Sequence, residues 1–165
     1  MLASPLDYAP LAQHAVILYR IALALLGLAL AISVVTDLRS RLIYNVITLP
    51  ALALELLLVW LSAGLVTVGD AGVGVLICAG PFALSAIFGA MGMGDVKLMA
   101  VVGVVAGAAG GWTGALKVLT YIAVAGGVQV AVQWIFAALR KTERPKYIPY
   151  GVAIAAGTLV AWVTN

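Results

Sequence analysis

The sequence predicts an all-α fold: a polytopic membrane bundle of six transmembrane helices that forms one domain over residues 1–165. Of the 165 residues, 65% are hydrophobic and only 9% are charged. Soluble domains carry about 25% charged residues, so this chain has too few charges to cover a surface exposed to water. The apolar residues also form long runs, and about 20 such residues cross the ~30 Å hydrocarbon core of a bilayer. The composition therefore excludes a water-soluble protein.

The order of apolar runs and polar breaks defines the expected helices. An N-terminal tail, residues 1–14, precedes the first run. The expected spans are residues 15–35, 46–65, 73–90, 96–109, 115–139 and 148–163. The connections between them are a basic segment at 36–45, a short loop at Gly69 and Asp70, a glycine-rich motif at 89–95, the turn "GGWTG" at 110–114 and a charged segment at 140–147.

The distribution of basic residues predicts the orientation in the membrane. Cytoplasmic loops of membrane proteins carry an excess of Lys and Arg. Only Arg20 and Lys117 lie near span ends on one side. The connections after the first, third and fifth spans hold all the others: Arg39, Arg41, Lys97, Arg140, Lys141, Arg144 and Lys146. We therefore expect these three connections in the cytoplasm and both termini outside.

This topology brings two aspartates to the same depth. Asp37 ends the first span and Asp95 begins the fourth, both at the cytoplasmic edge. In a carboxylate pair, the ionised member takes a proton from water while the protonated member donates to the carbonyl oxygen that is attacked. A helix N-terminus favours an anion and a C-terminus disfavours it, and Lys97 adds positive charge near Asp95. The sequence therefore predicts Asp95 as the base and Asp37 as the acid, within a pair that titrates as a unit.

The glycines around Asp95 suggest a loop that binds an extended substrate. In "GMGDVK", Gly92 and Gly94 precede Asp95, and Lys97 follows it. Glycine lets a backbone turn tightly and approach another chain closely. A substrate helix must be unwound before it is cut, and its exposed amides then need partners in the membrane. By contrast, the spacing of four between Gly103, Gly107 and Gly111 is typical of a helix-contact face.

These residues resemble a known family. "GMGDVK" resembles the G-x-G-D signature of intramembrane aspartic proteases, in particular type IV prepilin peptidases. That family pairs this acid with an Asp that is followed six residues later by Ile, then Pro-Asn; here Asp37 is followed by Ile43, Tyr44 and Asn45. Tyr44 stands where the family has Pro. The family's Pro-Tyr/Phe-Gly-Pro appears as Pro149, Tyr150 and Gly151, followed by Val152. The resemblance covers about residues 20–160.

The resemblance implies an activity, a substrate and a location. It implies catalysis by Asp37 and Asp95, no cofactor and no metal, with the remaining motif residues in a substrate-binding loop: Gly92, Gly94, Lys97, Asn45, Pro149, Tyr150 and Gly151. The chain lacks the cytoplasmic loop with paired cysteines found in larger, methylating members, since Cys78 is its only cysteine. It looks like the short form that cuts Flp-type prepilins after a Gly, at the cytoplasmic face of the bacterial inner membrane. The partners would then be prepilin and the bilayer, with no nucleic acid. The sequence does not determine the oligomeric state.

Pilins of this kind usually carry an acidic residue shortly after the cut. Lys97, Arg39 or Arg41 would attract it.

Glu55 is the feature that a peptidase does not explain. It lies near the middle of the second span, where a charge costs about 2.5–3.5 kcal/mol on insertion scales. One alternative is therefore a small ion-coupled transporter that uses Glu55 with Asp37 and Asp95. The other interpretation is a structural Glu55, protonated or paired with Arg20.

Other classes of protein fit the motifs less well. A non-catalytic subunit of a secretion machine would need neither aspartate. The chain has one histidine, His14, so no H-E-x-x-H zinc motif is present, and it has no G-x-S-x-G elbow. A serine activated by Lys97 or Lys117 is a further protease chemistry that stays open.

Overall fold

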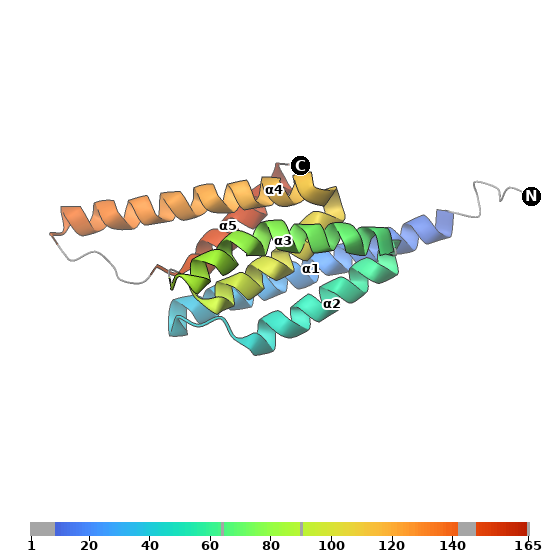
Figure 1. Ribbon diagram of the computed structural model, residues 1–165, viewed down its shortest axis with the longest axis horizontal. Helices are drawn as coiled ribbons and strands as arrows, with labels where there is room; N and C mark the ends of the chain where they lie inside the picture. The colour runs from blue at the N-terminus through green and yellow to red at the C-terminus, as the bar shows by residue number, and fades with distance from the viewer. Residues whose placement is uncertain (1–8, 64, 90, 142–147, 165) are drawn as a thin grey trace, which may run out of the picture.

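The computed structural model describes residues 9–63, 65–89, 91–141 and 148–164. The described residues form helices and no strands, which confirms the all-α prediction (Figure 1). A helix satisfies its backbone N–H and C=O groups internally, as a segment within a bilayer must. The helices are α1 (Ala9–Ser40), α2 (Asn45–Ala63), α3 (Leu65–Ile87), α4 (Met93–Leu139) and α5 (Tyr150–Val163).

Four of these helices are long and apolar enough to cross a membrane. The qualifying segments are Gln13–Ser40, Asn45–Ser62, Thr67–Ile87 and Met93–Leu139. The helix α5 is apolar but has 14 residues, fewer than the usual span. The chain is thus a multi-pass membrane protein, and the six crossings stay a prediction.

The helix α4 is two helical stretches joined at a break. Gly110 (φ −148°, ψ 20°) and Gly111 (φ 56°, ψ −145°) have non-helical backbones, and Figure 1 shows the chain turning back at this point. A positive φ strains every residue except glycine, so Gly111 permits the reversal. The break lies within the expected turn at 110–114, and the two stretches correspond to the expected fourth and fifth spans.

Close packing of α3 on α4 corrects two details of the predicted organisation. Gly103 and Gly107 form the expected contact face: a Cβ on Gly103 would lie 2.6 Å from the carbonyl oxygen of Gly74. Gly111 is not part of that face, because it makes the turn. The prediction of a loop at Gly69 and Asp70 was wrong, since both residues lie inside α3.

The physical reason is packing that continues along α3 through this segment. Ala71 is fully buried, and the backbone of Asp70 is in close contact with Gly107. Burial against α4 therefore outweighs the weak helix propensity of Gly and Asp. Instead, α2 ends at Ala63 and α3 begins at Leu65. The N-terminal tail is also shorter than expected, since α1 begins at Ala9; residues 1–8 and 142–147 lie outside the described part.

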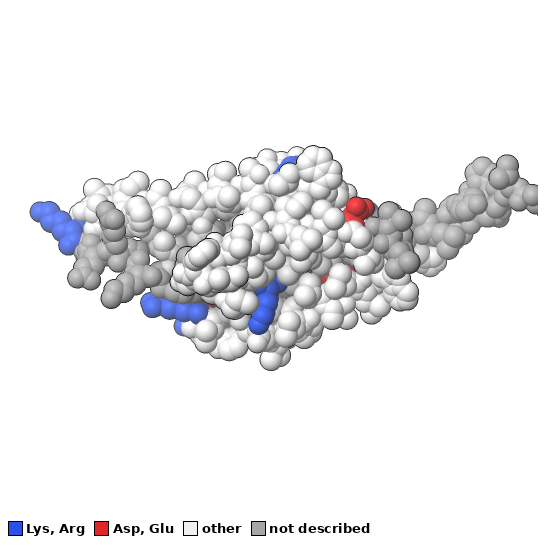
Figure 2. All heavy atoms as spheres, viewed as in Figure 1, with Lys and Arg blue, Asp and Glu red and all other residues white. Residues whose placement is uncertain are grey.

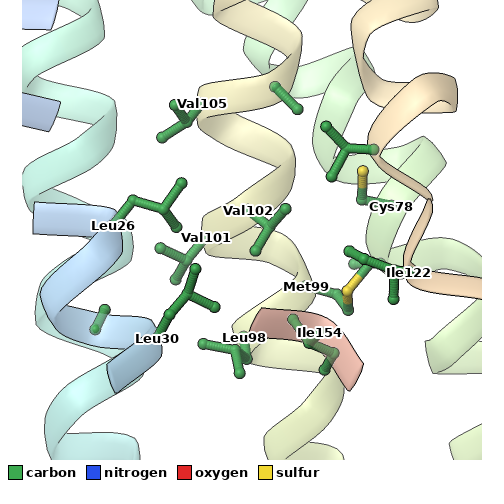
Figure 3. Packing of buried hydrophobic residues seen from close by; sticks show 14 of the residues in the cluster. Leu26, Leu30, Cys78, Leu98, Met99, Val101, Val102, Val105, Ile122 and Ile154 are labelled. Atoms are coloured by element: carbon green, nitrogen blue, oxygen red, sulfur yellow. The ribbon is translucent and has the colours of Figure 1, made fainter. Parts of the chain in front are cut away.

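The first stretch of α4 is the centre of the bundle. Every residue from Val101 to Gly107 is buried, and a helix that is buried on all sides has neighbours all around it. The helix α4 contacts α1, α2, α3 and α5. Figure 3 shows apolar side chains from these neighbours closing on it: Leu26 and Leu30 of α1, Cys78 of α3, Ile122 of the returning stretch of α4 and Ile154 of α5. This arrangement holds the start of α4, and with it Asp95, against its neighbours.

Candidate active site

Asp37 is buried one turn before the end of α1. Only 1% of the residue is exposed, because it continues the inward face of α1 that also carries Ala29, Leu30 and Ser33. Its Oδ2 accepts a hydrogen bond of 2.9 Å from the backbone N–H of Gly151. Gly151 is the second residue of α5, so the carboxyl group lies at a helix N-terminus. Unpaired N–H groups and the helix dipole there stabilise a negative charge.

Gly151 owes its role to the absence of a side chain. A Cβ at this position would stand 2.9 Å from Oδ2 and 3.3 Å from the Cβ of Asp37. Such contacts would push the carboxyl group away from its N–H donor. The sequence predicted Gly151 as part of a substrate-binding loop; its direct contact with Asp37 was not foreseen, because the two residues are 114 positions apart.

Neighbouring contacts fix the start of α5. The carbonyl oxygen of Pro149 accepts a 2.9 Å hydrogen bond from Nε2 of Gln129 on α4. The ring of Tyr150 meets Phe82 edge to face, with ring centroids 6.0 Å apart and planes at 81°. Tyr150 also covers Gly126, where a Cβ would stand 2.8 Å from the hydroxyl oxygen. These contacts place the predicted motif residues Pro149 and Tyr150 beside Asp37.

Asp95 lies in the first turn of α4 and is half-buried. Its backbone N–H donates a 3.2 Å hydrogen bond to the carbonyl oxygen of Gly92. The charge of Asp37 acts on Asp95, and α1 packs against α4. The structure therefore brings the two predicted aspartates into one site, each near the N-terminus of a different helix.

The glycines around Asp95 have separate roles. Gly89 has a φ of +72° and makes the left-handed turn after α3. A Cβ on Gly94 would stand 2.8 Å from the Cβ of Ile43, so Gly94 lets α4 approach the connection between α1 and α2. Gly92 is exposed and extended (φ −79°, ψ 144°). Of the two glycines predicted to face a substrate, Gly92 is the one with open backbone beside Asp95.

Lys97 bonds to the start of α2. Its Nζ donates a 2.6 Å hydrogen bond to Oδ1 of Asn45, so two predicted loop residues meet each other. The predicted assignment of acid and base relied on Asp95 at a helix N-terminus, on Lys97 nearby and on the C-terminal dipole of α1 acting on Asp37. The structure keeps Asp95 in the first turn of α4. It changes the other two premises, since Lys97 contacts Asn45 and Asp37 receives an N–H from α5.

A small cavity opens beside Asp37. Its volume is about 160 Å³, and its lining consists of Asp37, Leu38, Arg41 and Pro149. A water molecule occupies about 30 Å³ in the liquid, so the cavity has room for water. Of the three basic residues predicted to attract an acidic substrate, Arg41 is the one that lines it. Figure 2 shows several basic side chains toward the end of the molecule where α1 and α4 end.

Glu55 is fully buried on α2. Neither of its carboxyl oxygens has a hydrogen-bond partner among the described residues, so of the two structural interpretations of Glu55 the pairing with Arg20 is not formed. Among the same residues, no group of three His, Cys, Asp or Glu side chains is arranged to hold a metal ion.

Sequence reasoning missed Gln129. The available signal was an amide within the otherwise apolar run "AGGVQVAVQW", since polar residues inside spans are often functional. Its connection to Asp37 passes through Pro149 and Gly151, and it depends on how α4 folds back.

Comparison with known protein families places the chain in one of them. The model of the type IV leader peptidase family, Peptidase_A24, matches residues 24–139. The chain belongs to the type IV leader peptidase family. The match contains both aspartates and ends with α4, so the residues Pro149 to Gly151 lie beyond it. No curated protein and no solved structure matched the chain. As a member of this family, the protein is a peptidase of the prepilin type, embedded in a membrane.

Proposed function

We propose that this leader peptidase is an aspartic endopeptidase that cuts the leader of Flp-type prepilins at the cytoplasmic membrane face. The observation that carries the proposal is that Asp37, beside a cavity, and Asp95 lie at the same end of the bundle, close enough to interact electrostatically. Two interacting carboxyl groups can supply the general base and the general acid that activate water without a covalent intermediate.

In the proposed mechanism, Asp37 is the ionised member of the pair at rest. The N–H of Gly151 stabilises its negative charge, whereas Asp95 beside that charge holds a proton. A water molecule gives one proton to Asp37 and attacks the scissile carbonyl carbon, while Asp95 donates its proton to the carbonyl oxygen. The resulting gem-diol collapses, the C–N bond breaks, and the departing amine takes a proton from the pair. This assignment reverses the one that the sequence suggested.

The location of the site, the preference for an acidic residue in the substrate and the absence of methylation are inferred from basic residues and from the sequence. The basic residues after α1 and α4 favour a cytoplasmic site. Arg41 at the cavity supplies a positive charge for an acidic residue just after the cut. The absence of a paired-cysteine loop from the sequence supports cleavage without methylation of the new N-terminus.

The test is coexpression with a Flp-type prepilin, with the mobility shift of the pilin as the readout. We expect the wild type to cut and Asp37→Asn and Asp95→Asn to be inactive. Glu55→Gln is the control, because it replaces another buried acid outside the pair, and it should still cut. Cleavage by either Asp variant would show that the pair is not the catalyst.

Glu55 supports a second candidate function. A buried carboxyl group without a hydrogen-bond partner can bind a proton or cation, as an ion-coupled transporter requires. Purified protein in liposomes would then show a proton flux that Glu55→Gln abolishes. Equal flux in wild type and variant would leave Glu55 as a structural residue.

A further inference from the structure

In the side-chain amide of Gln129, the nitrogen makes a hydrogen bond and the oxygen makes none among the described residues. Nε2 donates to the carbonyl oxygen of Pro149 at 2.9 Å. That carbonyl can only accept, so the nitrogen must face it and Oε1 must face the other way. Oε1 is buried and has no hydrogen-bond partner among the described residues. Leaving a buried acceptor unpaired is costly, and the missing partner must be a donor.

An apolar groove runs from Gln129 into the membrane-embedded part of the protein. It lies between the returning stretch of α4 and α5 and has a volume of about 380 Å³. The α4 side includes Val124, Val128 and Gln129, and the α5 side includes Val152, Ala156 and Val160. Between residues 152 and 160 the groove extends for about two helical turns, or ~12 Å. We call it the α4–α5 groove.

The groove begins beside the proposed catalytic site. Gln129 holds Pro149, and Pro149 immediately precedes the start of α5, where Gly151 binds Asp37. A segment that leaves the Asp37 cavity along α5 would pass Gln129 first and then enter the apolar part. The lining includes exposed valines: Val128 is 57% exposed and Val160 is 46% exposed.

We propose that the α4–α5 groove docks the apolar helix of prepilin that follows the cut, and that Oε1 of Gln129 accepts a backbone N–H from its unwound start. This rests on the proposed function. An unwound segment exposes N–H groups that need acceptors, and a peptide bound at Asp37 would present them within a few residues. Lipid acyl chains would match the valines but carry no donor for Oε1. A prepilin helix satisfies both requirements, so Gln129 is a positioning residue.

Crosslinking tests the docking. The enzyme carries Asp95→Asn to stop cleavage and Cys78→Ala to remove its own thiol, and receives a single cysteine by Val128→Cys or Val160→Cys. The matched control is Leu84→Cys on α3, which replaces a residue of similar exposure, 60%. The full-length prepilin carries one cysteine, early or two turns later in its apolar helix. We expect disulfides from the early position to Val128→Cys and from the later one to Val160→Cys.

Equal crosslinking to Leu84→Cys, or none to the groove while the wild type cuts, would overturn the docking and leave the peptidase proposal standing. Failure of the wild type to cut would overturn both.

A double-mutant cycle tests the hydrogen bond. Gln129→Met should lower kcat/KM about tenfold, mainly through KM, with the catalytic pair intact. Prolines placed singly over the first turn of the prepilin helix remove one N–H each and are tolerated there. For the proline that removes the bonded N–H, the difference between wild type and Gln129→Met should shrink to the part that acts through Pro149. If the tenfold loss is the same for every proline substrate, Gln129 acts only through Pro149 and the proposed contact is wrong.

Discussion

The residue whose substitution is most informative is Gly151. Any side chain at this position would contact a carboxyl oxygen of the proposed catalytic pair. A methyl group in Gly151→Ala would lie 2.9 Å from Oδ2 of Asp37 and force the carboxyl group to move. A displacement of about 1 Å can cost 10²-fold in rate. We expect cleavage to slow by about that factor, measured as initial rates on prepilin in detergent.

The control for this substitution is Gly127→Ala. Gly127 lies on α4 with nothing within 4 Å of its Cβ position, so its replacement should leave the rate unchanged. Normal cleavage by Gly151→Ala would mean that the contact with Asp37 is not needed for catalysis.

Arg41 allows a second prediction at this scale. It lines the cavity with Asp37, so a negative charge there should repel the acidic residue of the pilin. An interaction of two charges 4 Å apart ranges from ~1 to ~4 kcal/mol between water and a surface-like environment. We expect Arg41→Glu to raise KM about tenfold or more for the natural pilin.

The same variant should behave differently with a pilin whose acidic residue is replaced by its amide, for which the rise in KM should shrink. Arg39→Glu adds the same charge on an exposed neighbouring position and should have a smaller effect. An equal effect of both variants would assign the change to general surface charge.

At the scale of elements, the break in α4 depends on one glycine. Gly111 has a φ of 56°, and an L-residue with a side chain pays about 1–2 kcal/mol in that conformation. Gly111→Ala should therefore lower the thermal unfolding midpoint of the purified protein. Gly110→Ala is the adjacent control, since Gly110 has a φ of −148° and open space around its Cβ position. Equal midpoints for the two variants would show that the turn tolerates a side chain.

Most element positions could be predicted from the sequence, because apolar runs and helix boundaries follow from local chemistry. The turn at Gly110 and Gly111 was expected from its glycines. Gly69 and Asp70 were misplaced because their local preference for a loop competes with packing against Gly107, a partner in another helix. Packing partners are not visible in a single sequence.

The candidate site also has features that the sequence predicts and features that it does not. That Asp37 and Asp95 share one end of the bundle follows from counting spans. The contact of Asp37 with Gly151, the bond between Lys97 and Asn45, and the half-used amide of Gln129 all join distant segments. They depend on how the helices pack and lay outside the reach of sequence patterns.

At the scale of the whole molecule, the orientation remains the main prediction. Single cysteines by Arg39→Cys, after α1, and by Trp112→Cys, at the break in α4, should react with a membrane-impermeant maleimide from opposite sides. Both positions are exposed in the structure, and Cys78→Ala removes the buried native thiol. We expect Trp112→Cys to react in intact cells whose outer membrane is opened, and Arg39→Cys only in inverted vesicles. Labelling of both from one side would exclude the six-crossing arrangement.

The hydrogen bond between Asp37 and Gly151 also sets an order of events during biosynthesis. Asp37 leaves the ribosome early, in the first helix, and its N–H donor belongs to the last helix, 114 residues later. Until α5 is inserted and docked, the first aspartate lacks the group that stabilises its charge. A nascent or C-terminally truncated chain would contain both aspartates and still be inactive. We therefore expect the proposed cleavage to begin only after α5 has docked against α1.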